Sequence, residues 1–111
     1  MIDKTIDKTY VETPQEIIDF MANSIKHILK TEFDKDLDDP SVEILDPFAG
    51  TGQFYNRMAD TGFLDPTKNY NLTAYELSKT RYKQMKKEFA KRNLKVNTKN
   101  IDTFLSEQKE L

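Results

Sequence analysis

The sequence predicts a domain of the α/β class, with three parallel strands, flanking helices and an N-terminal helix. Short segments rich in β-branched residues alternate with segments whose apolar residues recur at helical spacing. An amphipathic segment with a marked start precedes the first strand. Strands that alternate with helices favour right-handed crossovers and therefore a parallel sheet. A chain of 111 residues has room for one domain, so we expect residues 1–111 to form a single unit.

The N-terminal helix is predicted over residues 13–30, "TPQEIIDFMANSIKHILK". Thr13 is expected to be its N-cap, Pro14 its first residue, and Glu16 is expected to complete a capping box. Apolar residues then recur at helical spacing, namely Ile17, Met21, Ile25, Ile28 and Leu29. The acidic loop that follows contains Pro40, which excludes a continuation of the helix.

Three strands are predicted, over about residues 42–46, 70–77 and 94–102. Pro47 ends the first of them, because proline cannot donate to a sheet ladder. The segment "TFLSEQKEL" that follows the third strand is expected to begin another helix.

Two further helices are expected between the strands. The first runs from Gln53 to about Ala59 and is closed by Gly62. The second is capped by Ser78 and runs to about Asn93.

Composition narrows the class of protein. The chain has no cysteine, which excludes a disulfide framework and a thiolate zinc site. Its apolar runs extend over a few residues, and its N-terminus lacks the apolar region of a secretory signal. We therefore expect a cytoplasmic protein with no membrane partner and no metal.

Positive charge is concentrated in one stretch of the chain. Residues 79–99 carry nine Lys or Arg and one acid, Glu88, although the net charge of the whole chain is −2. Two interpretations stay open. The stretch is either a solvated helix face, which lysine-rich surfaces commonly form, or a surface that attracts an anionic partner.

Two of the three glycines, Gly50 and Gly52, lie directly after the first predicted strand. Glycine can adopt positive φ and lets a ligand approach the main chain. Ligands of parallel sheets bind in the crevice at the carboxyl ends of the strands, where Asp46 would also lie. The dinucleotide fingerprint needs a third glycine where this chain has Tyr55, and the phosphate-loop motif is absent too.

Glu76 follows Gly52 by 24 residues and ends the second predicted strand. In Rossmann-like pockets an acid about 20 residues after the glycine turn accepts hydrogen bonds from ribose hydroxyls. The glycine turn alone is weak evidence for a site. Together with Asp46 and Glu76 at two successive strand ends, it indicates a cofactor that contains ribose.

These residues resemble the cofactor motifs of a known family. "DPFAGTGQF" resembles the F-x-G-x-G motif of S-adenosylmethionine-dependent DNA methyltransferases that act on the exocyclic amine of adenine. "YVETPQEIIDFM", "AYEL" and "NIDTF" resemble the motif before it and the acidic motifs of strands 2 and 3. The resemblance covers about residues 10–104 and extends to members fused within restriction–modification polypeptides. It implies a partial Rossmann-like methyltransferase fold with an N-terminal capping helix.

The resemblance also implies roles for individual residues. Thr13 would close over the methionine end of S-adenosylmethionine, and Asp46 with the following backbone would hold its amino-acid portion. Glu76 would bind the ribose hydroxyls, and Leu77 and Asp102 would contact the adenine ring and its amine. The implied cofactor-binding set is Thr13, Asp46, Pro47, Phe48, Ala49, Gly50, Thr51, Gly52, Glu76, Leu77 and Asp102.

Each of these residues has a purely structural alternative. Thr13 and Asp102 could simply cap helices. The Asp46-Pro47 pair could be strand-to-turn chemistry, and Glu76 could be a surface acid. Phe48 and Leu77 could belong to the hydrophobic core.

The catalytic motif of the resembled family, [DNS]-P-P-[YFW] at the end of strand 4, is absent, because none of the four prolines is adjacent to another. We therefore assign no catalytic residue and expect a truncated cofactor-binding half that is inactive alone and part of a longer enzyme. Its partners would be DNA, through the parent protein, and the rest of the methyltransferase domain on the same or another chain. A bared strand-1 edge would also allow self-association.

Two other functions stay open from the sequence. The chain could be part of an RNA or protein methyltransferase, which share the glycine motif. It could also be a non-catalytic cofactor-binding or interaction half-domain. In the resembled fold the basic helix packs on the flank of the sheet, away from the target crevice, so contact with DNA there would be through phosphates and not sequence-specific.

Overall fold

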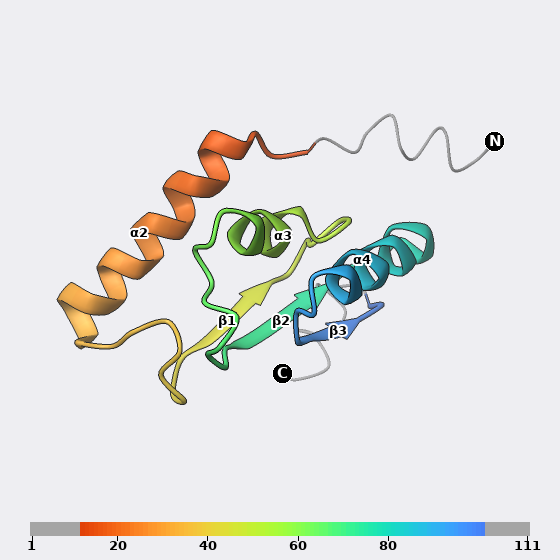
Figure 1. The fold of residues 1–111 in the computed structure, drawn as a ribbon. Coiled ribbons are helices and arrows are strands. Elements are labelled where there is room, and N and C mark those ends of the chain that lie inside the picture. The colour runs from red at the N-terminus through yellow and green to blue at the C-terminus, as the bar shows by residue number, and fades with distance from the viewer. Residues whose placement is uncertain (1–11, 102–111) are drawn as a thin grey trace, which may run out of the picture.

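The computed structural model describes residues 12–101, which form a three-stranded sheet with helices against one face and along one side (Figure 1). The helices α3 and α4 lie over the sheet, and α2 lies beside α3 beyond the first strand. No helix among these residues combines the length and apolarity needed to cross a lipid bilayer. The elements in chain order are α2 (Gln15–Phe33), β1 (Glu43–Asp46), α3 (Gln53–Asp60), β2 (Asn71–Tyr75), α4 (Lys79–Lys91) and β3 (Val96–Lys99).

The sheet has the order β1-β2-β3, and both strand pairs are parallel. The prediction of an α/β fold with three parallel strands and flanking helices is therefore confirmed. Because the strands are parallel, their carboxyl ends lie along one edge of the sheet. That edge carries Asp46 at the end of β1, Tyr75 at the end of β2 and Lys99 at the end of β3.

The start of α2 differs from the prediction. Pro14, with extended backbone angles, is the N-cap, and its carbonyl accepts the amides of Ile17 and Ile18 at 3.0 and 3.1 Å. No side chain caps this helix, so the prediction that Thr13 is the N-cap of a capping box is wrong. Thr13 precedes this N-cap by one residue, and its backbone amide and carbonyl are bound by the side chain of Gln53.

The other helix boundaries agree more closely with the sequence. The hydroxyl oxygen of Ser78 accepts the amide of Arg81 at 3.3 Å, which confirms Ser78 as the N-cap of α4. Gly62, with φ of 76°, follows the end of α3 as expected. The predicted helix after the third strand, and Asp102, lie outside the described residues.

Tyr55 occupies the centre of the core and is fully buried. Its hydroxyl lies 3.0 Å from the carbonyl oxygen of Ile44 on β1 and 2.9 Å from that of Thr73 on β2. It belongs to one core cluster with apolar residues of the sheet and of α3 and α4, namely Met58, Leu72, Ala74, Met85 and Phe89. Tyr55 therefore fixes the position of α3 over the first two strands.

Gly52 allows α3 to begin close to α4. Its φ is 84°, and a Cβ at this position would lie 2.6 Å from Phe89 and 3.0 Å from Met85. The expectation of positive φ at Gly50 and Gly52 is confirmed. The space in front of Gly52, however, is filled by core side chains, so the tight approach at this residue is between α3 and α4 and not between the main chain and a ligand.

Strand β1 forms one edge of the sheet within residues 12–101. The side chain of Leu45 on this strand is 49% exposed. The place of β1 at the edge of the sheet agrees with the expected bare edge, whereas self-association through it stays a prediction.

We predict that Gly52→Ala destabilises the protein far more than Gly62→Ala. Both positions have positive φ, which costs an alanine about 1–2 kcal/mol. Only the Cβ introduced at position 52 would also collide with Phe89, adding about 1–3 kcal/mol of overpacking. Urea unfolding monitored by circular dichroism measures both variants. Equal losses of unfolding free energy would show that α3 and α4 are not packed at this distance.

We also predict concentration-dependent self-association. An unpaired strand edge offers free amides and carbonyls to a second chain, and a charged side chain at such an edge opposes pairing. Sedimentation velocity over a range of concentrations should show a species larger than the monomer, and Leu45→Lys should reduce it. Phe33→Lys, at an exposed site on α2, serves as the control. A strictly monomeric wild type would contradict the prediction.

Candidate functional site

Asp46, the glycine turn and Glu76 converge at the carboxyl ends of β1 and β2. The turn after β1 is tied to β2 by the amide of Ala49, which donates to the carbonyl of Tyr75 at 2.9 Å. The backbone at Glu76 is in turn tied to β3, because its amide donates to the carbonyl of Lys99 at 3.0 Å. Asp46, the glycine turn and Glu76 are thereby held next to one another.

Glu76 binds the glycine turn directly. Its Oε1 accepts the amide of Gly50 at 2.7 Å, and its Oε2 accepts the amide of Ser78 at 2.8 Å. The guanidinium Nε of Arg81 also lies 3.3 Å from Oε2. The residue is 6% exposed, so the alternative that Glu76 is a surface acid is wrong.

Asp46 lies near this carboxylate at the end of β1. Its Oδ1 accepts the amide of Phe48 at 3.3 Å, so it also starts the turn. Burial raises the pKa of Asp46 above its ordinary value, and the negative charge of Glu76 raises it further. The carboxylate of Glu76 is therefore close enough to act on the charge of Asp46.

Phe48 and Leu77 are exposed at the same edge of the sheet. Their exposed fractions are 66% and 65%, so the alternative that they belong to the core is wrong. Each follows a strand end, and each presents apolar surface to solvent. Apolar side chains that flank a few fixed polar groups are typical of cofactor sites.

The remaining predicted residues of the turn differ in their exposure to solvent. Ala49 and Gly50 are buried, and Pro47 and Thr51 are half-buried. The carbonyl of Thr51 accepts the side-chain amide of Asn56 at 3.2 Å, which anchors the turn to α3.

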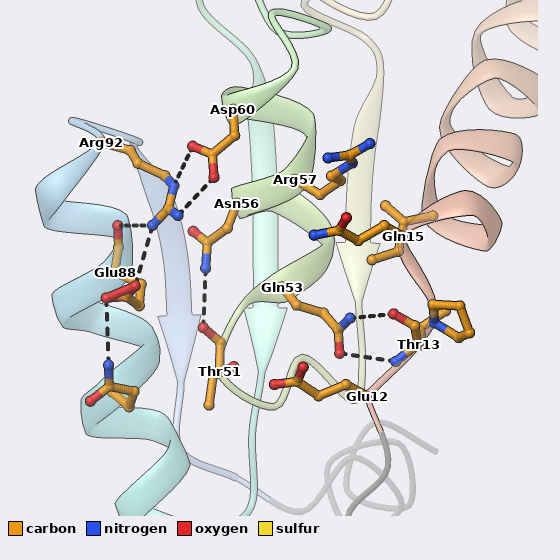
Figure 2. Close-up of a pocket in the computed structure, with 13 residues that line it drawn as sticks. Glu12, Thr13, Gln15, Thr51, Gln53, Asn56, Arg57, Asp60, Glu88 and Arg92 are labelled. Carbon is orange, nitrogen blue, oxygen red and sulfur yellow. Dashed lines mark hydrogen bonds and ion pairs between the residues drawn. The ribbon is translucent and has the colours of Figure 1, made fainter.

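Thr13 is brought to the start of α3 by a residue that the sequence did not single out. Gln53 donates through Nε2 to the carbonyl of Thr13 at 2.6 Å and accepts the amide of Thr13 at 3.1 Å. This two-point pairing places the backbone before α2 next to the glycine turn (Figure 2). A glutamine at the first position of a helix carries no sequence signal for such a contact.

Asn100 is a second residue that the sequence did not indicate. Its Nδ2 donates to the carbonyls of Glu76 and Leu77 at 2.8 and 3.0 Å. It thus fixes the main chain between β2 and α4. Asn100 lies in the segment "NIDTF", where only the acid was singled out.

A separate groove of about 730 Å³ lies between the start of α2, α3 and α4 (Figure 2). It includes Thr13 and Thr51 but not Asp46 or Glu76. Arg92 on the α4 side makes a two-point ion pair with Asp60 of α3, with both distances 2.8 Å. This groove is thus bordered by contacts that hold the helices together, and it is distinct from the strand-end site.

Comparison with known proteins finds similar segments in solved structures of proteins bound to DNA or to a DNA substrate mimic. No protein-family model matches the chain, and no curated protein matches it significantly. A complex of DrdV with DNA matches at 31% identity and a TM-score of 0.68, over 83% of this chain. A nuclease-deletion mutant of the Type ISP restriction–modification enzyme LlaGI, in complex with a DNA substrate mimic, matches at 30% identity and a TM-score of 0.67, over 92% of this chain.

A third match is the ATP-dependent Type ISP restriction–modification enzyme LlaBIII bound to DNA, at 31% identity and a TM-score of 0.60 over 75% of this chain. The chain spans 10%, 11% and 6% of the lengths of these three proteins. The chain is therefore similar to a segment of restriction–modification enzymes.

The raised pKa of Asp46 predicts how Asp46→Asn changes stability with pH. The pKa of Asp46 is higher in the folded protein than in the unfolded chain. The contribution of this carboxyl to the stability of the fold therefore decreases as the pH rises from about 4 through the folded pKa. Asp46→Asn keeps an oxygen for the amide of Phe48 but has no charge to bury. We therefore expect the variant to gain unfolding free energy relative to the wild type at pH 7, and the gain to disappear near pH 4.

Asp65→Asn is the matched control, because hydrogen bonds from Thr67 lower the pKa of Asp65. That variant should lose stability at pH 7, and its loss should shrink as the pH falls. Urea unfolding at several pH values measures both variants. A loss at pH 7 for Asp46→Asn would show that its charge is stabilised in the fold, contrary to the burial described above.

Proposed function

We propose that this chain is the S-adenosylmethionine-binding portion of a DNA adenine-N6 methyltransferase of the restriction–modification type. The main support is the hydrogen bond of 2.7 Å by which buried Glu76 holds the amide of Gly50. This hydrogen bond joins the glycine motif to the acidic motif of strand 2, the two segments that resemble the family's cofactor motifs, at the carboxyl edge of the sheet. The similarity to DNA-bound restriction–modification enzymes supports the choice of DNA as the parent's substrate.

Glu76 is suited to bind ribose hydroxyls, although its carboxylate already has protein partners. Two carboxylate oxygens offer about four acceptor sites, and three donors occupy them here. The amides of Gly50 and Ser78 hold the group in place. The contact with Arg81 is the longest of the three, so we propose that ribose hydroxyls use the remaining site or take the place of Arg81.

Asp46, Phe48 and Leu77 complete the proposed site. The ammonium group of the cofactor's amino-acid portion would favour the charged form of Asp46 and thereby offset its raised pKa. The exposed ring of Phe48 and the side chain of Leu77 would lose water against the cofactor, which contributes about 25 cal/mol for each Å² of apolar surface buried. Asp102 keeps its proposed role at the adenine amine.

The residues of this chain contribute binding and orientation to the parent reaction. The bound cofactor supplies a methyl group on a positively charged sulfur. That methyl group would pass to the exocyclic amine of a flipped adenine as its bond to sulfur breaks, leaving a neutral thioether and releasing one proton from the amine, so the role of this chain would be to align the cofactor. Because the chain lacks the [DNS]-P-P-[YFW] motif, we propose that it does not transfer methyl groups alone.

We predict that Phe48→Ser and Leu77→Ser abolish most of the rise in melting temperature that S-adenosylmethionine causes in the wild type. A ligand that binds the folded state alone raises its stability, and each variant removes apolar contact with that ligand. Because both side chains are mainly exposed, the melting temperatures without cofactor should change by less than about 3 °C. Differential scanning fluorimetry with and without cofactor measures this.

Phe20→Ser is the matched control, because Phe20 on α2 is 71% exposed and lies outside the strand-end site. It should keep the full cofactor-dependent rise. Wild-type protein whose melting temperature does not respond to S-adenosylmethionine at millimolar concentration would contradict the proposed function. An equal rise in all four proteins would show that the cofactor binds elsewhere.

A further inference from the structure

The helix α4 presents a continuous row of lysines, which we call the lysine stripe. All of its members are exposed, and successive spacings of four, three, one and four residues place them on one side of the helix. They are Lys79, Lys83, Lys86, Lys87 and Lys91. Met85 and Phe89, on another side of the same helix, are buried in the core. The lysine stripe therefore faces solvent and contributes little to packing.

The charge of the lysine stripe is poorly compensated by acids. Glu88 is the single acid of α4, and it is bound by Lys91 at 2.9 Å and by Arg92 at 3.5 Å. Lys79, Lys83 and Lys87 have no ion pair within residues 12–101.

The two arginines of this stretch have different roles from the lysines. Arg81 binds Glu76, and Arg92 binds Asp60 of α3. Both arginines are partly buried, and each binds an acid outside α4. The nine bases of residues 79–99 therefore form two groups. The two arginines hold the fold together, and the seven lysines are exposed. Two of these lysines, Lys95 and Lys99, lie beyond the helix.

The dimensions of the lysine stripe suit a nucleic acid backbone. From Lys79 to Lys91 the helix rises about 18 Å, at 1.5 Å per residue. One DNA strand carries a phosphate about every 3.4 Å along the duplex axis, so the row spans about five phosphates. Lysine ammonium groups act as mobile point charges, which suits phosphates and does not distinguish bases.

We propose that the lysine stripe binds the phosphate backbone of duplex DNA outside the strand-end site. This inference rests on the proposed function, because DNA is chosen from the DNA-bound proteins that the chain resembles and from the charge complementarity. The contact is independent of base sequence. Binding releases counterions from the DNA, so the affinity falls steeply as the salt concentration rises.

The test compares two triple variants of the 111-residue chain with equal net charge. One is Lys79→Gln/Lys83→Gln/Lys87→Gln on the lysine stripe, and the control is Lys26→Gln/Lys30→Gln/Lys68→Gln at exposed positions elsewhere. Fluorescence anisotropy measures binding to a labelled duplex of about 20 base pairs, from about 50 to 200 mM salt. Each lost phosphate contact lowers the slope of log K against log salt by about 0.9.

We expect the lysine-stripe variant to lower that slope by about 2–3 and to weaken binding at low salt about tenfold or more. The control should bind within about twofold of the wild type, since it changes net charge but not the lysine stripe. Equal losses in both variants, or no binding of the duplex by the wild type at low salt, would overturn the proposal. Tighter binding of an RNA duplex of the same length would overturn the choice of DNA.

The melting-temperature rise with S-adenosylmethionine is measured on the same three proteins. If DNA binding fails while the cofactor-dependent rise remains, the lysine stripe is a solvated face and the proposed function stands. If DNA binds through the lysine stripe but the cofactor causes no rise, the proposed function fails and the surface is still an anion-binding one.

Discussion

The hydrogen bond between the carboxylate of Glu76 and the amide of Gly50 is the interaction on which the strand-end region depends. A buried carboxylate is stable only if its charge is compensated by donors. Here the donors are the amides of Gly50 and Ser78 and the guanidinium of Arg81. One side chain therefore fixes the turn after β1, the turn after β2 and the first turn of α4 relative to one another.

The glycine turn is held from two sides. Gly50 is bound to Glu76, and Gly52 packs against Phe89, so neither glycine is free to move far. Solvent reaches this region mainly where Phe48 and Leu77 lie. A ligand of this region would thus meet a preformed surface, and little conformational entropy would be lost on binding.

The sequence was most informative where structure depends on local chemistry. Ser78 as a cap, positive φ at both turn glycines, and the end of the first strand at Asp46 follow from short-range rules. The failure at Thr13 has a long-range cause, because the amide of Gln53 lies 40 residues away and competes for its backbone. Gln53 and Asn100 could not be predicted for the same reason: their partners lie 40 and 23–24 residues away and become neighbours only in the folded chain.

The helix α4 links the two proposed binding surfaces without making them compete. Its first turn is bound to Glu76 through Ser78 and Arg81, its buried side packs on the core, and its lysine stripe faces solvent. Anions attracted to the lysine stripe therefore need not compete with Glu76 for Arg81. Because one rigid helix carries both surfaces, DNA held on its outer side would be positioned relative to the strand ends by the same core that Tyr55 and Gly52 organise.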